Sequence, residues 1–258
     1  MKTNINGTGL GFELFGDSGL PVVLIHGFGL NRSTWLEMVE TSMSDYQVIL
    51  PDVRGHGESD APEGAYPMSL LADDIAGLLD HLEIEKAVIC GHSMGGYIAL
   101  AFADRYPERL LGLGLITSRS GSDSAEKRQG RYRLVEEVRE RGSVVLAESL
   151  SKRITKDPVL QKWVYDLILT THPQGIIGAA LGMAERPDRT EMLRRLDRPV
   201  LVAAGAEDQI VPLEEARKIA DLLQLGTFVE IPDAGHLPMM ETPFILSEAI
   251  MSTFSILM

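Results

Sequence analysis

The sequence predicts an α/β fold in which a mostly parallel sheet carries helices on both faces. Short apolar runs alternate along the chain with amphipathic stretches, which is the order of parallel strands and their connecting helices. Most of these runs lack polar alternation, as expected of strands covered on both faces. The chain has 258 residues, of which 45% are hydrophobic, so a large core without disulfides is feasible.

Seven segments are expected to form strands. Residues 10–15 alternate in polarity and are expected to form an antiparallel edge strand near the N-terminus. The other six are apolar throughout: residues 21–25, 47–50, 87–90, 111–116, 199–203 and 227–231. The single cysteine, Cys90, lies in one of these runs and is expected to be a buried strand residue, because one thiol makes no intrachain disulfide.

Segments with the apolar spacing of amphipathic helices connect these strands. They are found over residues 69–82, 95–105, 213–223 and 244–254. In the first of these segments Leu71, Ile75 and Leu78 recur at helical spacing, and Ser69 is the expected N-cap. Pro107 ends the second segment, since proline does not continue a helix.

Residues 119–195 differ from the rest of the chain. They hold most of the Arg and Lys clusters and no strand-like run. Residues 131–141 and 174–185 are expected to be helical, and residues 159–168 carry a wide apolar stripe that includes Trp163. The sequence therefore predicts a helical insertion at 119–195 within a core formed by residues 1–118 and 196–258.

Charge and hydropathy argue against several partners. The formal net charge of −13 repels phosphate backbones and anionic membrane surfaces, so we expect neither nucleic acid nor a membrane as a partner. No apolar run is long enough to span a bilayer, and the first residues lack the apolar core of a signal peptide. A cytoplasmic location is therefore expected, whereas the sequence predicts no oligomeric state.

The strongest chemical signal is GHSMGG at residues 91–96, between a predicted strand and a predicted helix. A Gly-x-Ser-x-Gly motif in this setting forms a sharp turn that exposes the serine above the sheet. Gly91 and Gly95 have no Cβ, so neighbouring backbone can approach closely. Ser93 would lie at a helix N-terminus, where free N–H groups favour negative charge, and is the predicted nucleophile.

A serine hydroxyl needs a base, and the base needs a carboxylate that orients it. Of six histidines, His236 directly follows the last predicted strand, at the carboxyl edge of the sheet where ligands bind. Asp208 follows the strand before it and is the preferred partner, with Glu207 and Asp233 as alternatives. Structural or solvated roles are expected for the other histidines: His26, His56, His81, His92 and His172.

Two backbone N–H groups are expected to stabilise a developing oxyanion. One belongs to Met94, which follows the predicted nucleophile, and the other to Phe28 in the segment HGFG at 26–29. Each such donor contributes roughly 10²–10³ in turnover.

Together these segments resemble the α/β-hydrolase superfamily, in particular its lid-bearing serine esterases, lactonases and haloperoxidase-like enzymes. The matching segments are HGFG at 26–29, DVRGHGESD at 52–60, GHSMGG at 91–96, GAEDQIVP at 205–212 and AGHLPMMETP at 234–243. The resemblance implies a mostly parallel eight-stranded sheet and a helical cap inserted after the sixth strand, at 119–195. It also implies structural roles for Arg54 and His56, and Ser93 separates the chain from relatives that use an aspartate nucleophile.

The expected activity is hydrolysis of a small or medium carboxylic ester through an acyl-serine intermediate, without metal or organic cofactor. The alternatives are hydrolysis of an enol-lactone, a thioester or a C–C bond of a diketone, a cofactor-free haloperoxidase-like, perhydrolase-like or lyase activity, and a non-catalytic binding protein. Trp163 and Met239 are expected to wall the substrate pocket. No Arg or Lys is placed in that pocket from sequence, so a charged substrate is neither supported nor excluded.

Overall fold

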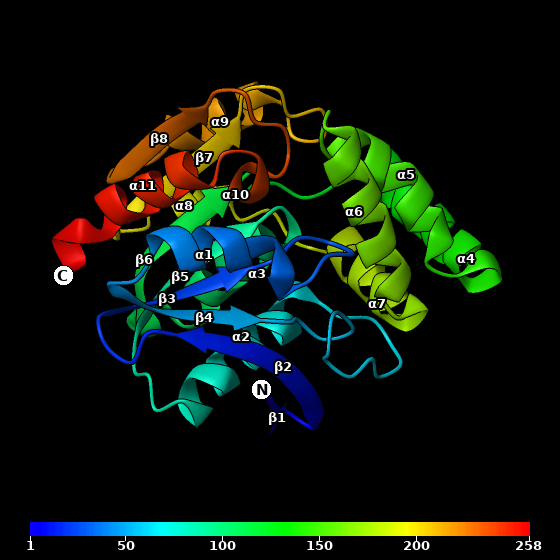
Figure 1. The fold of residues 1–258 in the computed structure, drawn as a ribbon, viewed down its shortest axis with the longest axis horizontal. Helices are drawn as coiled ribbons and strands as arrows, with labels where there is room; N and C mark the ends of the chain where they lie inside the picture. Colours follow the sequence, from blue (N-terminus) through cyan, green and yellow to red (C-terminus); the bar gives the residue numbers. More distant parts are fainter.

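The computed structural model describes residues 1–258 and contains one eight-stranded sheet with the order β1-β2-β4-β3-β5-β6-β7-β8 (Figure 1). The β1–β2 and β2–β4 pairs are antiparallel and all other pairs are parallel, which confirms the predicted fold class. The strands are β1 (Lys2–Ile5), β2 (Thr8–Phe15), β3 (Leu20–Ile25), β4 (Tyr46–Pro51), β5 (Ala87–His92), β6 (Leu110–Ile116), β7 (Val200–Gly205) and β8 (Gly226–Ile231).

Helices cover both faces of this sheet. Those outside the β6–β7 connection are α1 (Leu36–Ser42), α2 (Met68–His81), α3 (Met94–Arg105), α9 (Leu213–Ala220), α10 (Pro238–Glu241) and α11 (Pro243–Phe254). Three short 3₁₀ helices are η1 (Arg32–Trp35), η2 (Pro107–Arg109) and η3 (Ser255–Leu257). None of the helices combines the length and the apolar composition of a membrane-spanning segment.

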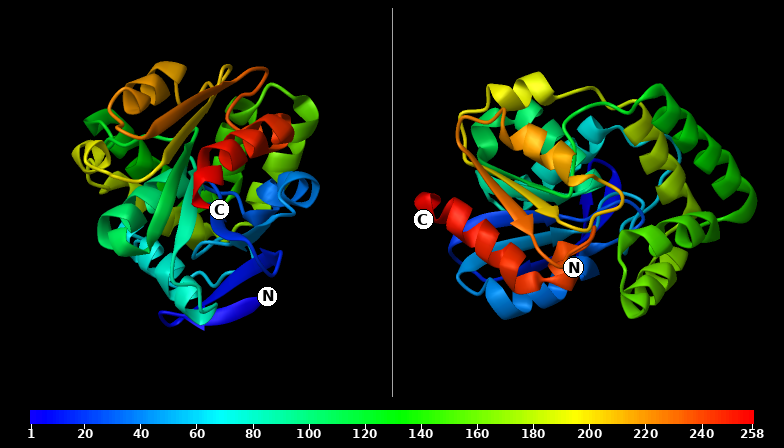
Figure 2. Two further views of the ribbon diagram at one scale, coloured as in Figure 1. Left: turned by 90° about the vertical axis from the view of Figure 1, so that its left-hand side faces the viewer. Right: turned by 90° about the horizontal axis from the view of Figure 1, so that it is seen from above.

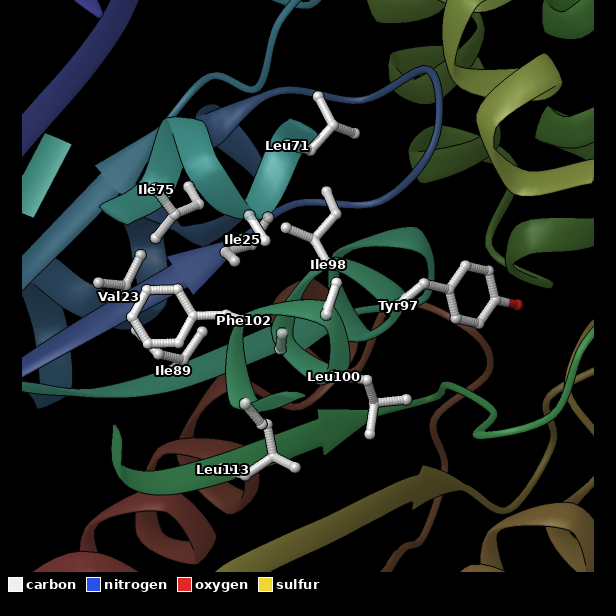
Figure 3. Packing of buried hydrophobic residues seen from close by; sticks show 14 of the residues in the cluster. Val23, Ile25, Leu71, Ile75, Ile89, Tyr97, Ile98, Leu100, Phe102 and Leu113 are labelled. Atoms are coloured by element: carbon white, nitrogen blue, oxygen red, sulfur yellow. The ribbon is translucent and has the colours of Figure 1, made fainter. Parts of the chain in front are cut away.

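Successive side chains of the central strands point to opposite faces of the sheet. They therefore divide the core into two apolar clusters, one on each face of the sheet. In β3, Val23 and Ile25 belong to the cluster that contains α2 and α3, while Val22 and Leu24 belong to the cluster that contains α1 and α11. Figure 3 shows part of the first cluster, with Phe102 of α3 close to the sheet. Both faces are apolar, which explains why the strands read as continuous apolar runs.

The structure differs from the sequence prediction at the ends of two helices and in one additional strand. Helix α2 begins at Met68 directly after Pro67, so Ser69 lies inside the helix and is not its cap. Strand β1 was not predicted because its sequence, KTNI, is mostly polar and pairs only with β2 at the sheet edge. Helix α9 ends at Ala220, three residues before the predicted end.

Five helices lie between β6 and β7, within residues 119–195: α4 (Ala125–Arg141), α5 (Val144–Ile154), α6 (Pro158–Thr170), α7 (Pro173–Ala184) and α8 (Thr190–Arg194). Helices α4–α7 gather to one side of the sheet, beyond the strand ends (Figures 1 and 2). Helix α5 was not predicted, whereas the three predicted helices correspond to α4, α6 and α7. The carboxyl ends of the strands thus face this layer of helices.

Candidate active site

Ser93 occupies a strained turn between β5 and α3. Its backbone has φ +53° and ψ −110°, in the region that L-residues rarely adopt, and such residues cost of order 1–3 kcal/mol. The turn is held by groups at the end of β6 and directly after it. The Ser93 N–H donates to the Ile116 carbonyl over 2.9 Å, and the Ser118 hydroxyl donates to the Ser93 carbonyl over 2.7 Å. These bonds fix the serine at the N-terminus of α3.

The two glycines of the motif are required by close backbone contacts around this turn. A Cβ at Gly91 would lie 2.0 Å from the Gly95 carbonyl oxygen, and a Cβ at Gly95 would lie 2.3 Å from the Ile25 carbonyl oxygen. Real Cβ atoms do not approach backbone oxygen so closely. Any side chain at either position would displace Ser93 from its present geometry.

His236 and Asp208 form a buried pair at the carboxyl ends of β8 and β7. His236 Nδ1 lies 2.7 Å from Asp208 Oδ2, and both side chains are almost fully buried. The second carboxylate oxygen accepts from the N–H groups of Ile210 and Val211, over 2.7 and 3.0 Å. A carboxylate only accepts, so Nδ1 carries the proton and Nε2 of the neutral ring is free to act as a base.

Ser93 and His236 line the same cavity, which has a volume of about 300 Å³. Eighteen residues line it, nine of them hydrophobic, and several belong to α4 and α5. No hydrogen bond joins the Ser93 hydroxyl to the His236 ring. Such bonds tighten on substrate binding in many enzymes. The cavity therefore offers a nucleophile and a base to one bound molecule.

The two predicted oxyanion donors flank Ser93. Met94 is the first residue of α3, so its N–H has no intrahelical partner. Phe28 follows β3 and lines the cavity, and its N–H donates to no protein group. Both donors therefore remain available to a ligand.

The alternative carboxylates lie elsewhere. Glu207 is exposed and pairs with Lys156 over 2.9 Å. Asp233 is also exposed, in a turn with φ +57°. Asp208 alone of the three predicted candidates contacts the His236 ring.

The two residues expected to wall the pocket do not line this cavity. Met239 is completely buried in the apolar cluster that contains α11, and Trp163 of α6 packs against that same cluster. Their apolar surface is used for packing between helices, so this expectation is corrected. Most of the helical residues that line the cavity belong instead to α4 and α5.

A family model described as alpha/beta hydrolase fold matches residues 21–243. The chain belongs to the α/β-hydrolase family. A solved structure of a thermophilic esterase from Thermogutta terrifontis superposes with a TM-score of 0.92 and 43% identity, covering 97% of this chain and 95% of that one. The hydrolase is also 30% identical to 3-oxoadipate enol-lactonase 2 of Acinetobacter baylyi, over 95% of this chain and 94% of the relative. It is likewise 30% identical to a non-heme chloroperoxidase of Streptomyces lividans, over 97% of both chains.

Glu241 is a residue of this α/β-hydrolase that the sequence analysis missed. Its Oε2 accepts from the N–H groups of Gly235 and Leu237, over 2.9 and 3.0 Å, on either side of His236. Its Oε1 accepts from the Thr155 hydroxyl over 2.6 Å. An acidic residue five positions after the predicted base was the available signal. Glu241 therefore holds the loop that carries the histidine.

The same loop is bonded to the end of α5. The His236 N–H donates to the carbonyl of Ile154, the last residue of α5, over 3.0 Å. With the Thr155–Glu241 bond, two adjacent residues of the insertion contact the histidine loop. The position of His236 in the hydrolase thus depends on the helices between β6 and β7.

Replacing Glu241 with Gln is expected to lower kcat by about 10- to 100-fold, because a displaced base costs about this much. Glutamine has the same size, but its NH2 group donates and cannot accept. It therefore cannot replace both carboxylate oxygens of Glu241 as hydrogen-bond acceptors. KM should change little, since Glu241 does not line the cavity. Steady-state kinetics test this, with Glu248→Gln on the exposed side of α11 as the matched control. Equal kcat for both variants would contradict the role of Glu241.

Three other histidines of the hydrolase are buried and bonded to backbone. His26 Nε2 accepts from the Val53 N–H over 3.0 Å, and His56 Nδ1 donates to the Arg54 carbonyl over 3.1 Å. His92 Nε2 donates to the carbonyl of His236 over 2.7 Å. These rings hold loops at the carboxyl edge, and one of them supports the backbone of the predicted base.

Burial keeps these rings neutral. It lowers the pKa of His26 to about 4 and, with the neighbouring His26, that of His56 to about 3. Burial also holds the pKa of His92 well below its usual range. Arg54 itself forms a buried ion pair with Asp74, so the segment around residues 52–60 is a packed structural turn.

We expect the free energy of unfolding to fall as the pH drops from 7 to 5. The unfolded state binds protons at its histidines near pH 6.5, whereas the folded state does not until about pH 4 at His26 and about pH 3 at His56. Each of these two rings should therefore cost about 2 kcal/mol at pH 5. Urea unfolding at several pH values measures this.

His56→Asn should give a shallower pH dependence than the parent, while the exposed His81→Gln should leave the slope unchanged. Identical slopes for the parent and His56→Asn would argue against neutral burial of His56.

Proposed function

We propose that the protein hydrolyses carboxylic esters by a two-step acyl transfer with Ser93 as nucleophile, His236 as base and Asp208 as its orienting carboxylate. The observation that carries this proposal is the cavity shared by a strained serine and a histidine whose other nitrogen is bonded to a buried carboxylate. The strained turn at Ser93 costs folding stability, which favours a functional reason for its presence.

In the first step, Ser93 Oγ attacks the carbonyl carbon and its proton moves to His236 Nε2. The oxyanion accepts hydrogen bonds from the N–H groups of Phe28 and Met94. The bond to the alcohol then breaks, and the alkoxide leaves with the proton from His236, which gives an acyl-Ser93 ester. Asp208 stabilises the transient imidazolium without taking its proton.

In the second step, water attacks the acyl-Ser93 carbonyl and gives its proton to His236. The bond to Ser93 Oγ then breaks and the proton returns to Oγ, which releases the acid and restores the serine. A cavity of about 300 Å³ with half of its lining residues hydrophobic suits a small or medium acyl or alcohol group. We propose that residues 119–195 act as the cap that encloses this group.

Hydrolysis of an enol-lactone is the second candidate activity. It is supported by the 30% identity to the Acinetobacter baylyi protein named an enol-lactonase, which extends over 95% of the chain. A lactone is a cyclic ester, so the same residues perform the same steps, and the leaving enol stays attached to the acyl group. A panel of lactones tested beside open-chain esters distinguishes the two. The cytoplasmic location and the lack of a nucleic-acid partner stay predictions.

A fluorophosphonate probe tests the central proposal, because it forms a covalent bond only with an activated serine. The folded protein is expected to label at Ser93 and to hydrolyse short p-nitrophenyl esters, and Ser93→Ala is expected to do neither. A folded protein that takes up no probe would favour a non-catalytic role.

A further inference from the structure

The cavity has a cationic side that contrasts with the acidic chain around it. The net charge of the chain is −13, yet four cationic residues and one acidic residue line the cavity: Arg119, Lys127, Arg131, Arg153 and Asp123. They come from the segment after β6 and from α4 and α5. These cationic residues line the same cavity as Ser93.

Asp123 does not neutralise this side of the cavity, because it already has two partners. Its carboxylate pairs with Arg131 and, over 2.8 Å, with Arg186, whose side chain is 3% exposed. Arg186 also lies over the ring of Tyr97, at 4.0 Å from the ring centre. Two guanidinium groups share one carboxylate, so this cluster keeps a positive charge.

Arg119 is held in place by its own contacts. It donates to the Ile210 carbonyl over 2.9 Å and has a long contact of 3.8 Å with Glu215. Lys127 and Arg153 make no ion pair and no side-chain hydrogen bond. Burial and the neighbouring Arg119 lower the pKa of Lys127. Both residues are exposed and line the cavity, so their charged groups have no protein acceptor there.

An anionic group in the cavity would bond to donors that the protein leaves free and would relieve repulsion between the cations. Hydrogen bonds to ionised partners are stronger than neutral ones. We propose that the site selects esters or lactones that carry a second, ionised carboxylate, which Lys127 and Arg153 bind while Ser93 attacks the ester carbonyl. This inference rests on the proposed esterase function and names the substrate class.

The apolar part of the lining favours a carbon chain between the two carboxyl groups. Leu134 of α4 and Leu150 of α5 line the cavity among the cationic residues of the same helices. A monoester of a short dicarboxylic acid presents this pattern, with an uncharged ester at one end, methylene groups between and a carboxylate at the other end.

Matched pairs of substrates test the inference. Monoethyl glutarate and monoethyl adipate carry the carboxylate, and ethyl 5-oxohexanoate and ethyl 6-oxoheptanoate replace it with a methyl ketone of similar size. We expect kcat/KM to be about 10- to 100-fold higher for the anionic member of at least one pair, which is what one or two bonds to a charged group supply. Added salt should raise KM for that member only.

Lys127→Gln with Arg153→Gln should remove most of this preference, measured as the ratio of kcat/KM for the anionic and the neutral member of each pair, since the lost binding is specific to the carboxylate. The matched control is Arg133→Gln, which removes one charge from an exposed position of α4 outside the cavity. Thermal unfolding of each variant checks that it is folded, and the two single variants separate the contributions.

Equal kcat/KM for the anionic and neutral members of every pair would overturn the inference, and so would a double variant that keeps the preference. In both cases labelling of Ser93 and hydrolysis of the neutral esters would leave the esterase function intact. Loss of labelling and of all ester hydrolysis in the parent protein would instead refute the esterase function itself.

Discussion

Ser93→Ala is expected to lower kcat/KM for ester hydrolysis by about 10⁴-fold to 10⁶-fold, the loss seen when a triad nucleophile is removed. No other hydroxyl is placed on the same strained turn, and the residual rate would come from the two backbone donors and substrate binding alone. The measurement is steady-state kinetics with short p-nitrophenyl esters, with fluorophosphonate labelling beside it. A decrease of only a few-fold would mean that another group performs the attack.

The stabilities of two inactive variants measure the backbone strain at Ser93 separately from the role of its hydroxyl. Ser93→Gly and Ser93→Ala both lack the hydroxyl, but only glycine adopts φ +53° without a steric penalty. The glycine variant is expected to be the more stable of the two by about 1 kcal/mol after its larger loss of chain entropy is included. Urea unfolding checks this, and a less stable glycine variant would contradict strain at the turn.

Asp208→Asn is expected to reduce kcat by about 10³-fold to 10⁴-fold while the fold is retained. An asparagine amide can donate to His236 Nδ1, which favours the tautomer with its proton on Nε2. That nitrogen then cannot accept the serine proton. The rate of fluorophosphonate labelling should fall together with kcat, because both reactions need the activated hydroxyl.

Asp233→Asn serves as the control for this substitution. It makes the same chemical change in the loop after β8, three residues before His236, at an exposed residue that does not contact the His236 ring. Its kcat should match that of the parent. Comparable losses in both variants would show that the effect is one of net charge rather than of tautomer.

Most of the fold was predictable because its signals are local. The apolar strands could be read from continuous runs, and the turn at Ser93 from a motif in its strand–helix setting. The pairing of His236 with Asp208 followed from their positions after the last two strands. Strand β1, by contrast, depends on its neighbour β2 more than on its own polar sequence.

The walls of the cavity could not be predicted in the same way. Trp163 and Met239 have the apolar character of pocket residues, but helix packing buries Met239 in the core and places Trp163 against the same cluster. Lys127 and Arg153 look like ordinary surface cations in the sequence, and only the placement of α4 and α5 makes them line the same cavity as Ser93. Glu241 acquires its role through partners in two different segments.

The bonds from Ile154 and Thr155 to the histidine loop have a consequence for protein engineering. The helices between β6 and β7 are not an exchangeable module, since transplanting them from another enzyme also replaces two of the anchors of His236. A chimaera built in this way should lose turnover even for substrates that never touch the grafted side chains. Recombination aimed at new specificity should therefore retain the native end of α5 together with Glu241.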